Sequence, residues 1–156
     1  MKPASASIVI VMLATSAMAA DELPKELFLR CEVEDISSTV VGTKQDTSVV
    51  KEVRHFHLKD GVFELTSGRV PLGTGCVLYK GEVTCTYNRT KKSTSAEFGP
   101  SVEVRSSYVG LNRATGELRH GINLKFYKGD TAGGTPSMTL VTLTQGICRT
   151  IDKPLF

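Results

Sequence analysis

The stretch CVLYKGEVTC, residues 76–85, decides the fold of this 156-residue chain. It has a cysteine at each end and Lys80-Gly81 at its midpoint. A two-residue hairpin loop favours glycine because it needs positive φ angles. With Lys80-Gly81 as that loop, Cys76 falls directly opposite Cys85, in a non-hydrogen-bonded pair whose Cα atoms are close enough for a disulfide. The spacing therefore predicts a disulfide that fixes the register of a β-hairpin.

The N-terminus reads as a leader. MKPASASIVIVMLATSAMA has a lysine at position 2, an apolar run over residues 8–13 and an Ala17-Met18-Ala19 cleavage pattern. This arrangement is typical of a secretory signal peptide, and the apolar run is too short to cross a bilayer as a helix. No later stretch is long and apolar enough to do so. We expect residues 1–19 to be removed and residues 20–156 to form one periplasmic or secreted domain.

Export also decides how the cysteines are interpreted. The chain has four of them, and an even number in an exported protein favours disulfides over metal ligands or a thiol nucleophile. The hairpin register pairs Cys76 with Cys85. This leaves Cys31 to pair with Cys148, near the two ends of the mature chain.

The rest of the sequence reads as strands separated by turn signals, without a convincing helical period. We expect strands over residues 26–35, 48–59, 62–68, 76–80, 82–90, 101–112, 117–127 and 138–149. About eight short antiparallel strands at this spacing predict an all-β fold, a single meander closed as an up-and-down barrel, with a two-sheet sandwich as the alternative. A disulfide between the first and last strands favours closure, because those strands are neighbours in a barrel.

A second hairpin gives an independent register. Asp60-Gly61 is the strongest short hairpin signal, and a two-residue loop there sets Leu58 opposite Phe63. Phe56 then falls opposite Leu65. All four apolar side chains share one face of the hairpin, as a core requires.

The third hairpin places a candidate binding residue. Residues 114–116, Ala-Thr-Gly, fit a three-residue loop with glycine in a left-handed bulge. That register sets Tyr108 opposite Ile122 on the inner face and Gly110 opposite His120. His120 alternates with apolar residues, so it faces inward, and the glycine leaves room above its ring. We therefore name His120, Gly110 and Tyr108 as candidate ligand-binding residues.

The last strand does not alternate cleanly. Val141, Leu143 and Ile147 lie on one side, whereas Leu140 and Cys148 take the other. A β-bulge at Gly146 would reconcile the two sets of residues.

His55 and His57 are the candidate metal ligands. Residues i and i+2 of a strand point to one face, so both imidazoles could bind one metal ion. The hairpin register turns Phe56 inward and both histidines toward solvent, with His57 opposite Glu64. No third ligand is apparent from the sequence.

Charge and motifs narrow the function. The formal net charge of +3 is small, and the one basic cluster, residues 89–92, lies in a polar run with loop composition. We therefore expect no nucleic-acid partner. The sequence has neither a G-x-S-x-G elbow nor an H-E-x-x-H motif. It indicates no catalytic residue and no cofactor, so we expect a protein that is not an enzyme.

Three functional hypotheses follow. The first is an envelope binding or interaction module that acts through a barrel mouth, a sheet edge or a loop. The second is a lipocalin-like carrier of a small apolar ligand, because eight-stranded barrels hold either side chains or one small ligand. The third is a metal-binding protein or enzyme that uses His55 and His57. A filled interior favours the first hypothesis, and a persistent cavity favours the second.

The sequence also resembles a set of small secreted bacterial proteins of unknown function. The shared features are the leader, a cysteine in the first mature strand (LFLRCEVED, residues 27–35), an R-x-T-G hairpin (NRATGEL, residues 112–118) and a G-x-C end (QGICRT, residues 145–150). The resemblance implies an exported β-rich fold and assigns no activity, ligand or site residue.

Overall fold

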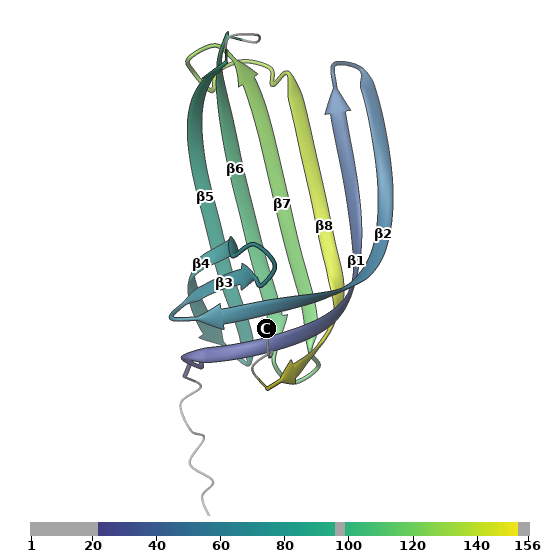
Figure 1. Cartoon of the computed structure of the whole chain (residues 1–156), viewed down its shortest axis with the longest axis vertical. Helices are drawn as coiled ribbons and strands as arrows, with labels where there is room; N and C mark the ends of the chain where they lie inside the picture. The colour runs from purple at the N-terminus through teal and green to yellow at the C-terminus, as the bar shows by residue number, and fades with distance from the viewer. Residues whose placement is uncertain (1–21, 96–98, 153–156) are drawn as a thin grey trace, which may run out of the picture.

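The computed structural model describes residues 22–95 and 99–152, so the predicted leader lies outside the described residues. These residues form eight antiparallel strands that follow one another around a closed barrel (Figure 1). The strands are β1 Glu26–Val41, β2 Lys44–Lys59, β3 Val62–Leu65, β4 Val70–Tyr79, β5 Glu82–Ser95, β6 Gly99–Asn112, β7 Glu117–Lys128 and β8 Met138–Ile151. The meander barrel is thereby confirmed over the sandwich. No helix that could cross a membrane occurs in this part of the chain.

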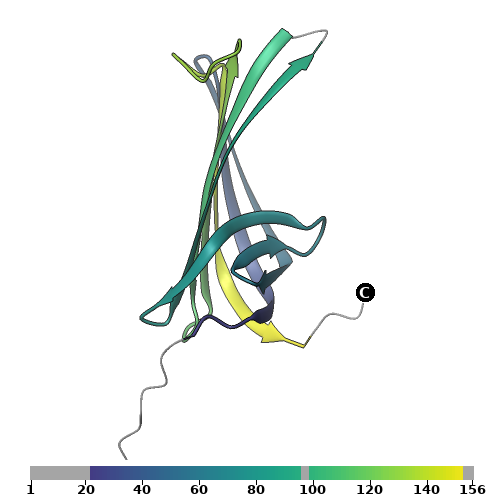
Figure 2. The same ribbon diagram turned by 90° about the vertical axis from the view of Figure 1, so that its left-hand side faces the viewer.

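The barrel closes at one end only. Strands β3 and β4 have 4 and 10 residues, whereas the other six have 12 to 16. β2 pairs with β3 only through residues 56–59. Beyond this point the six long strands continue as a single-layer sheet in the order β2-β1-β8-β7-β6-β5, which we call the extended sheet (Figures 1 and 2). The inner face of the extended sheet is the side that continues into the barrel interior and toward which β3 and β4 project. The outer face is the opposite side.

Several strands are longer than predicted. The first hairpin was expected to end its strands at residues 35 and 48, but β1 and β2 pair as far as Val41 and Lys44. β5 likewise pairs with β6 as far as Ser95, so the basic cluster at residues 89–92 lies on an exposed strand and not in a loop. These segments are rich in valine, serine and threonine and each has a paired neighbour, which outweighs their polar composition.

The core fills the closed end of the barrel. Alternate residues of each strand point inward there, as the period of two requires. Phe56 and Phe63 stack with ring centroids 5.5 Å apart. The buried cluster consists of Leu29, Cys31, Val33, Phe56, Leu58, Phe63, Leu72, Cys76, Val83, Cys85, Val109, Leu111, Leu118 and Cys148.

The two hairpins with two-residue loops have the predicted registers. Leu58 lies opposite Phe63, and Val77 lies opposite Thr84. Next to Val77, a β-bulge in β4 places two residues opposite Cys85. The disulfide between Cys76 and Cys85 forms across this bulge, with Cα atoms 4.2 Å apart.

The second predicted disulfide closes the barrel. Cys31 of β1 lies directly opposite Cys148 of β8, with Cα atoms 4.0 Å apart. Both cysteines belong to the buried core, so this disulfide joins the first and last strands from inside.

The predicted three-residue loop of the third hairpin is wrong by one residue. The observed loop has four residues, 113–116, and Leu111 pairs with Leu118. Asn112 accounts for the longer loop, because its Oδ1 accepts hydrogen bonds from the backbone N–H groups of Ala114 and Thr115, at 2.9 and 3.1 Å. Gly116 still takes the expected left-handed conformation, with φ of 75°.

The shifted register moves two candidate binding residues out of the barrel. Tyr108 lies opposite Gly121 and not opposite Ile122, and its side chain is 48 % exposed on the outer face. Gly110 lies opposite Arg119, so it is not the neighbour of His120. A one-residue slip exchanges the two faces of a strand, which explains both errors. His120 keeps its predicted inward position, because the prediction assigned the correct set of alternate β7 residues to the barrel interior.

The last strand contains no bulge. β8 pairs with β1 in unbroken register from Ile151 to Met138. Val141, Leu143 and Ile147 simply lie exposed on the outside. Gly146 faces inward against β1, so closely that a Cβ there would lie 2.2 Å from a backbone oxygen.

Candidate functional site

An open cavity of about 790 Å³ lies at the mouth of the barrel, between the inner face of the extended sheet and the β3–β4 segment. Its volume is within the range of small-ligand sites. Its lining combines an apolar wall with a few polar groups, as such sites commonly do. The apolar wall consists of Phe56, Leu65, Val70, Leu72 and Ile122. A persistent cavity was the observation expected to favour the carrier hypothesis over a filled interior.

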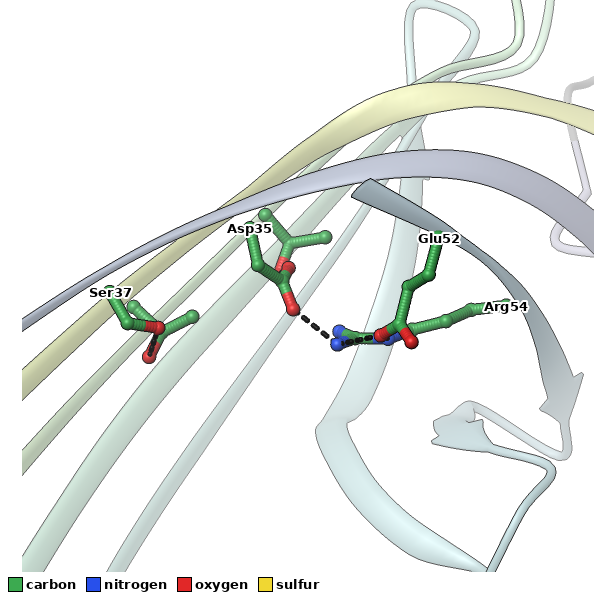
Figure 3. A network of polar contacts seen from close by, with 6 residues as sticks. Asp35, Ser37, Glu52 and Arg54 are labelled. Atoms are coloured by element: carbon green, nitrogen blue, oxygen red, sulfur yellow. Dashed lines mark hydrogen bonds and ion pairs between the residues drawn. The ribbon is translucent and has the colours of Figure 1, made fainter. Parts of the chain in front are cut away.

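The β1–β2 side of the mouth carries an ionic cluster around one buried carboxylate. Asp35 is 8 % exposed, and its carboxylate pairs with the guanidinium of Arg54. The hydroxyl of Thr144 donates a hydrogen bond to the same carboxylate. Glu52 pairs with Arg54 from the other side, and Figure 3 shows both carboxylates converging on that guanidinium. The acidic groups on this wall are therefore already engaged.

The opposite side of the mouth carries an arginine with a different environment. Arg105 of β6 is half-buried, and its Nη2 donates to the backbone oxygen of Pro71 at 3.3 Å. Its guanidinium lies over the ring of Tyr87, 5.4 Å from the centroid. Within the described residues no carboxylate pairs with it. Arg105 is thus a cation held by neutral groups at the cavity wall.

His120 lies deepest among the titratable groups of the cavity, at 3 % exposure. Burial, and secondarily the positive charge of Arg105, lower the pKa of His120 to about 4. The ring is therefore neutral at physiological pH. A neutral imidazole offers one hydrogen-bond donor and one acceptor, without a charge that would repel an organic guest.

Three buried polar atoms at this cavity lack a hydrogen-bond partner. They are Nε2 of His120, Nε of Arg105 and Oγ1 of Thr66, and all three residues line the cavity. Among the described residues only one other side chain has such an atom, Asn123 of the outer face. Buried polar groups in native proteins nearly always have a partner. These three atoms are therefore the polar groups of the cavity wall that are available to a hydrogen-bonding partner.

The two candidate metal ligands have different surroundings. The Nε2 and Nδ1 atoms of His57 contact the carboxylates of Glu26 and Glu64 at 3.0 and 3.3 Å. The ring also stacks on Phe28, with centroids 4.2 Å apart. The predicted pairing of His57 with Glu64 is confirmed, and His55 lies two residues away at the edge of the mouth cavity. No metal-binding group of three or more His, Cys, Asp or Glu residues occurs in residues 22–95 and 99–152.

The outer face of the extended sheet carries an apolar row across five strands. Val49, Ile36 and Leu143 lie in register on β2, β1 and β8, followed by Gly121 and Tyr108 on β7 and β6. Two hollows of about 710 and 520 Å³ lie on this side. Among the described residues that line these two hollows, only Asn123 has a buried polar atom without a hydrogen-bond partner.

Sequence reasoning identified His120 but missed Asp35, Arg54 and Arg105. In VEVRSSY, residues 102–108, polar and apolar residues alternate, but only Arg105 of this segment lines the cavity, and Val102 on the other face is 1 % exposed. The alternation alone therefore does not show which face is the interior.

The architecture is that of an eight-stranded antiparallel barrel with an open, partly polar mouth. No protein-family model matches the sequence, and a comparison with curated proteins finds no match. The resemblance to small secreted bacterial proteins stays a prediction.

Proposed function

We propose that this protein is an exported, non-enzymatic barrel that binds one small organic ligand in its mouth cavity. The observation that carries the proposal is the group of three unpartnered buried polar atoms, on Thr66, Arg105 and His120, within one cavity that also has an apolar wall. Apolar lining provides affinity, and a few oriented polar groups hold one end of a ligand. Export is supported by the two disulfides, which persist in oxidising compartments.

The test uses N-phenyl-1-naphthylamine, a neutral apolar dye whose fluorescence rises when it leaves water. Wild-type protein should bind the dye saturably at one site. In the variant Ile122→Trp, an indole fills the cavity wall, so dye affinity should fall by about tenfold, equivalent to about 1.4 kcal/mol. The matched control is Val141→Trp, which adds the same group on the outer face of the neighbouring strand.

Unchanged dye affinity in Ile122→Trp, or a loss confined to Val141→Trp, would contradict binding in the mouth. Native mass spectrometry of protein purified from the periplasm adds a second readout. A retained small molecule supports the proposal. A retained protein partner without a small molecule would instead favour the interaction hypothesis and the apolar row of the outer face.

A further inference from the structure

The mouth cavity has two walls of opposite electrostatic character. On the β1–β2 wall, Arg54 is neutralised by two carboxylates, Asp35 and Glu52. On the β5–β6 wall, Arg105 lies directly opposite Arg89 in the strand register, and paired residues of an antiparallel sheet share one face. Neither arginine has an ion-pair partner among the described residues.

Two like charges directly opposite each other destabilise a sheet. An anion placed between them removes the repulsion and gains charge-assisted hydrogen bonds. The unpartnered Nε of Arg105 is a donor that such an anion can use, in addition to the Nη2 group bonded to Pro71. The β5–β6 wall is therefore built to hold a negative group at the barrel mouth.

An apolar track runs beside this wall. On the inner face of β7 and β8, Leu124 lies opposite Leu140, and Phe126 lies opposite Met138. All four side chains are partly exposed on the inner face of the extended sheet. Leu124 is also the direct neighbour of Arg105 across the β6–β7 pair. The positive charge of Arg105 therefore lies next to the apolar side chain of Leu124.

We propose that the ligand is a single-chain amphiphile with a carboxylate end, held by Arg105 with Arg89 at the entrance, and with its chain on the β7–β8 track and the apolar wall. The proposal rests on the function proposed above. A carboxylate suits the site better than a phosphate. Of the arginines that line the cavity, Arg54 is already paired with Asp35 and Glu52, and Arg105 has no acidic partner. Arg89 lies outside this lining, so one negative charge is matched within the cavity and a second one is not.

The neutral state of His120 agrees with this ligand class. Its uncharged ring and the Thr66 hydroxyl supply the remaining hydrogen bonds near the polar end without a second fixed charge. A cationic amphiphile, by contrast, would meet Arg105, whereas Glu103, the carboxylate on the same face of β6, is not among the residues that line the cavity.

The experiment measures displacement of N-phenyl-1-naphthylamine by four probes of equal chain length, used below their micelle concentrations: dodecanoate, dodecan-1-ol, dodecyl phosphate and dodecyltrimethylammonium. Dodecanoate should displace the dye at a concentration at least about tenfold lower than dodecanol, because a charge-assisted hydrogen bond is worth about that factor. The variant Arg105→Gln should lower dodecanoate affinity by about 10- to 100-fold and change dodecanol affinity by less than about threefold. The control Arg149→Gln removes an exposed arginine of β8 outside the cavity and should change neither.

Failure of this inference differs visibly from failure of the proposed function. If wild-type protein binds the dye but dodecanoate and dodecanol compete equally, the carboxylate assignment is overturned and the carrier function stands. Stronger competition by dodecyl phosphate or by the ammonium probe also overturns it. If the dye does not bind, the proposed function itself fails. Should Arg105→Gln not fold, Arg105→Lys must preserve the preference for dodecanoate and Arg89→Gln must weaken it.

Discussion

The ring of Tyr108 covers Gly121 on the neighbouring strand, and a Cβ at position 121 would lie 2.2 Å from Cε1 of that ring. An aromatic side chain laid over a cross-strand glycine is a known way of stabilising a sheet position that lacks its own side chain. The contact exists only in the observed register, because the predicted one would have set Tyr108 against Ile122.

Gly121→Ala should therefore be destabilising, by about 1–3 kcal/mol, because the new methyl group displaces the ring. In a Tyr108→Ala background the same change should cost at least about 0.5 kcal/mol less, since the obstacle is gone. Urea unfolding followed by circular dichroism measures the four free energies of this double-mutant cycle. Additive costs would show that the two residues do not touch.

The two disulfides should contribute unequally to stability. Cys31–Cys148 closes a sequence separation of 117 residues, whereas Cys76–Cys85 closes one of 9. By loop-closure entropy the first should stabilise the fold by about 5 kcal/mol and the second by about 3 kcal/mol. The paired variants Cys31→Ala/Cys148→Ala and Cys76→Ala/Cys85→Ala can be compared by denaturant unfolding. A larger loss from the hairpin pair would contradict closure of the barrel by the long-range disulfide.

The buried pair of Asp35 and Arg54 gives a third prediction. Arg54→Met leaves a buried carboxylate with only its hydrogen bond from Thr144, so it should destabilise the fold by about 3–5 kcal/mol. Adding Asp35→Leu removes the unpaired charge and should recover most of that loss. Equilibrium unfolding at neutral pH measures both steps. A double variant less stable than Arg54→Met would mean that Asp35 supports the barrel independently of its partner.

Local loop chemistry determined how well the sequence predicted the fold. The Asp60-Gly61 and Lys80-Gly81 hairpins have two-residue loops, in which glycine and loop length fix the register together. Both registers are confirmed next to the loops, although a bulge in β4 replaces the expected direct pairing of Cys76 with Cys85. The third hairpin depends on the side chain of Asn112, which caps a loop that is one residue longer. A side-chain cap of this kind is compatible with several loop lengths, so composition alone could not select the register.

The site was harder to predict than the fold. His120 could be placed because it interrupts an otherwise apolar face of a single strand. Arg105 and Arg54 could not, because alternation within a strand does not say which face is the interior when both carry apolar residues. Their inward position depends on the open mouth of the barrel beyond β3 and β4. This mouth exists because β3 and β4 are shorter than the other strands, and no local sequence pattern encodes that difference.

His120 gives the last prediction, which concerns pH. Its folded-state pKa of about 4 lies below the usual 6.5, so the unfolded chain binds a proton that the folded chain excludes. The stability that depends on the neutral ring is therefore fully present above pH 6.5 and is lost as the pH falls toward 4, by about 3 kcal/mol in total. His120→Gln should be less stable than wild type at pH 7, by about 1–3 kcal/mol, because packing is lost. Between pH 7 and 4.5 its unfolding free energy should fall less than that of the wild type, so the two curves converge. Parallel curves, or a His120 ring that titrates near 6.5 by NMR, would contradict its burial at the bottom of the mouth cavity.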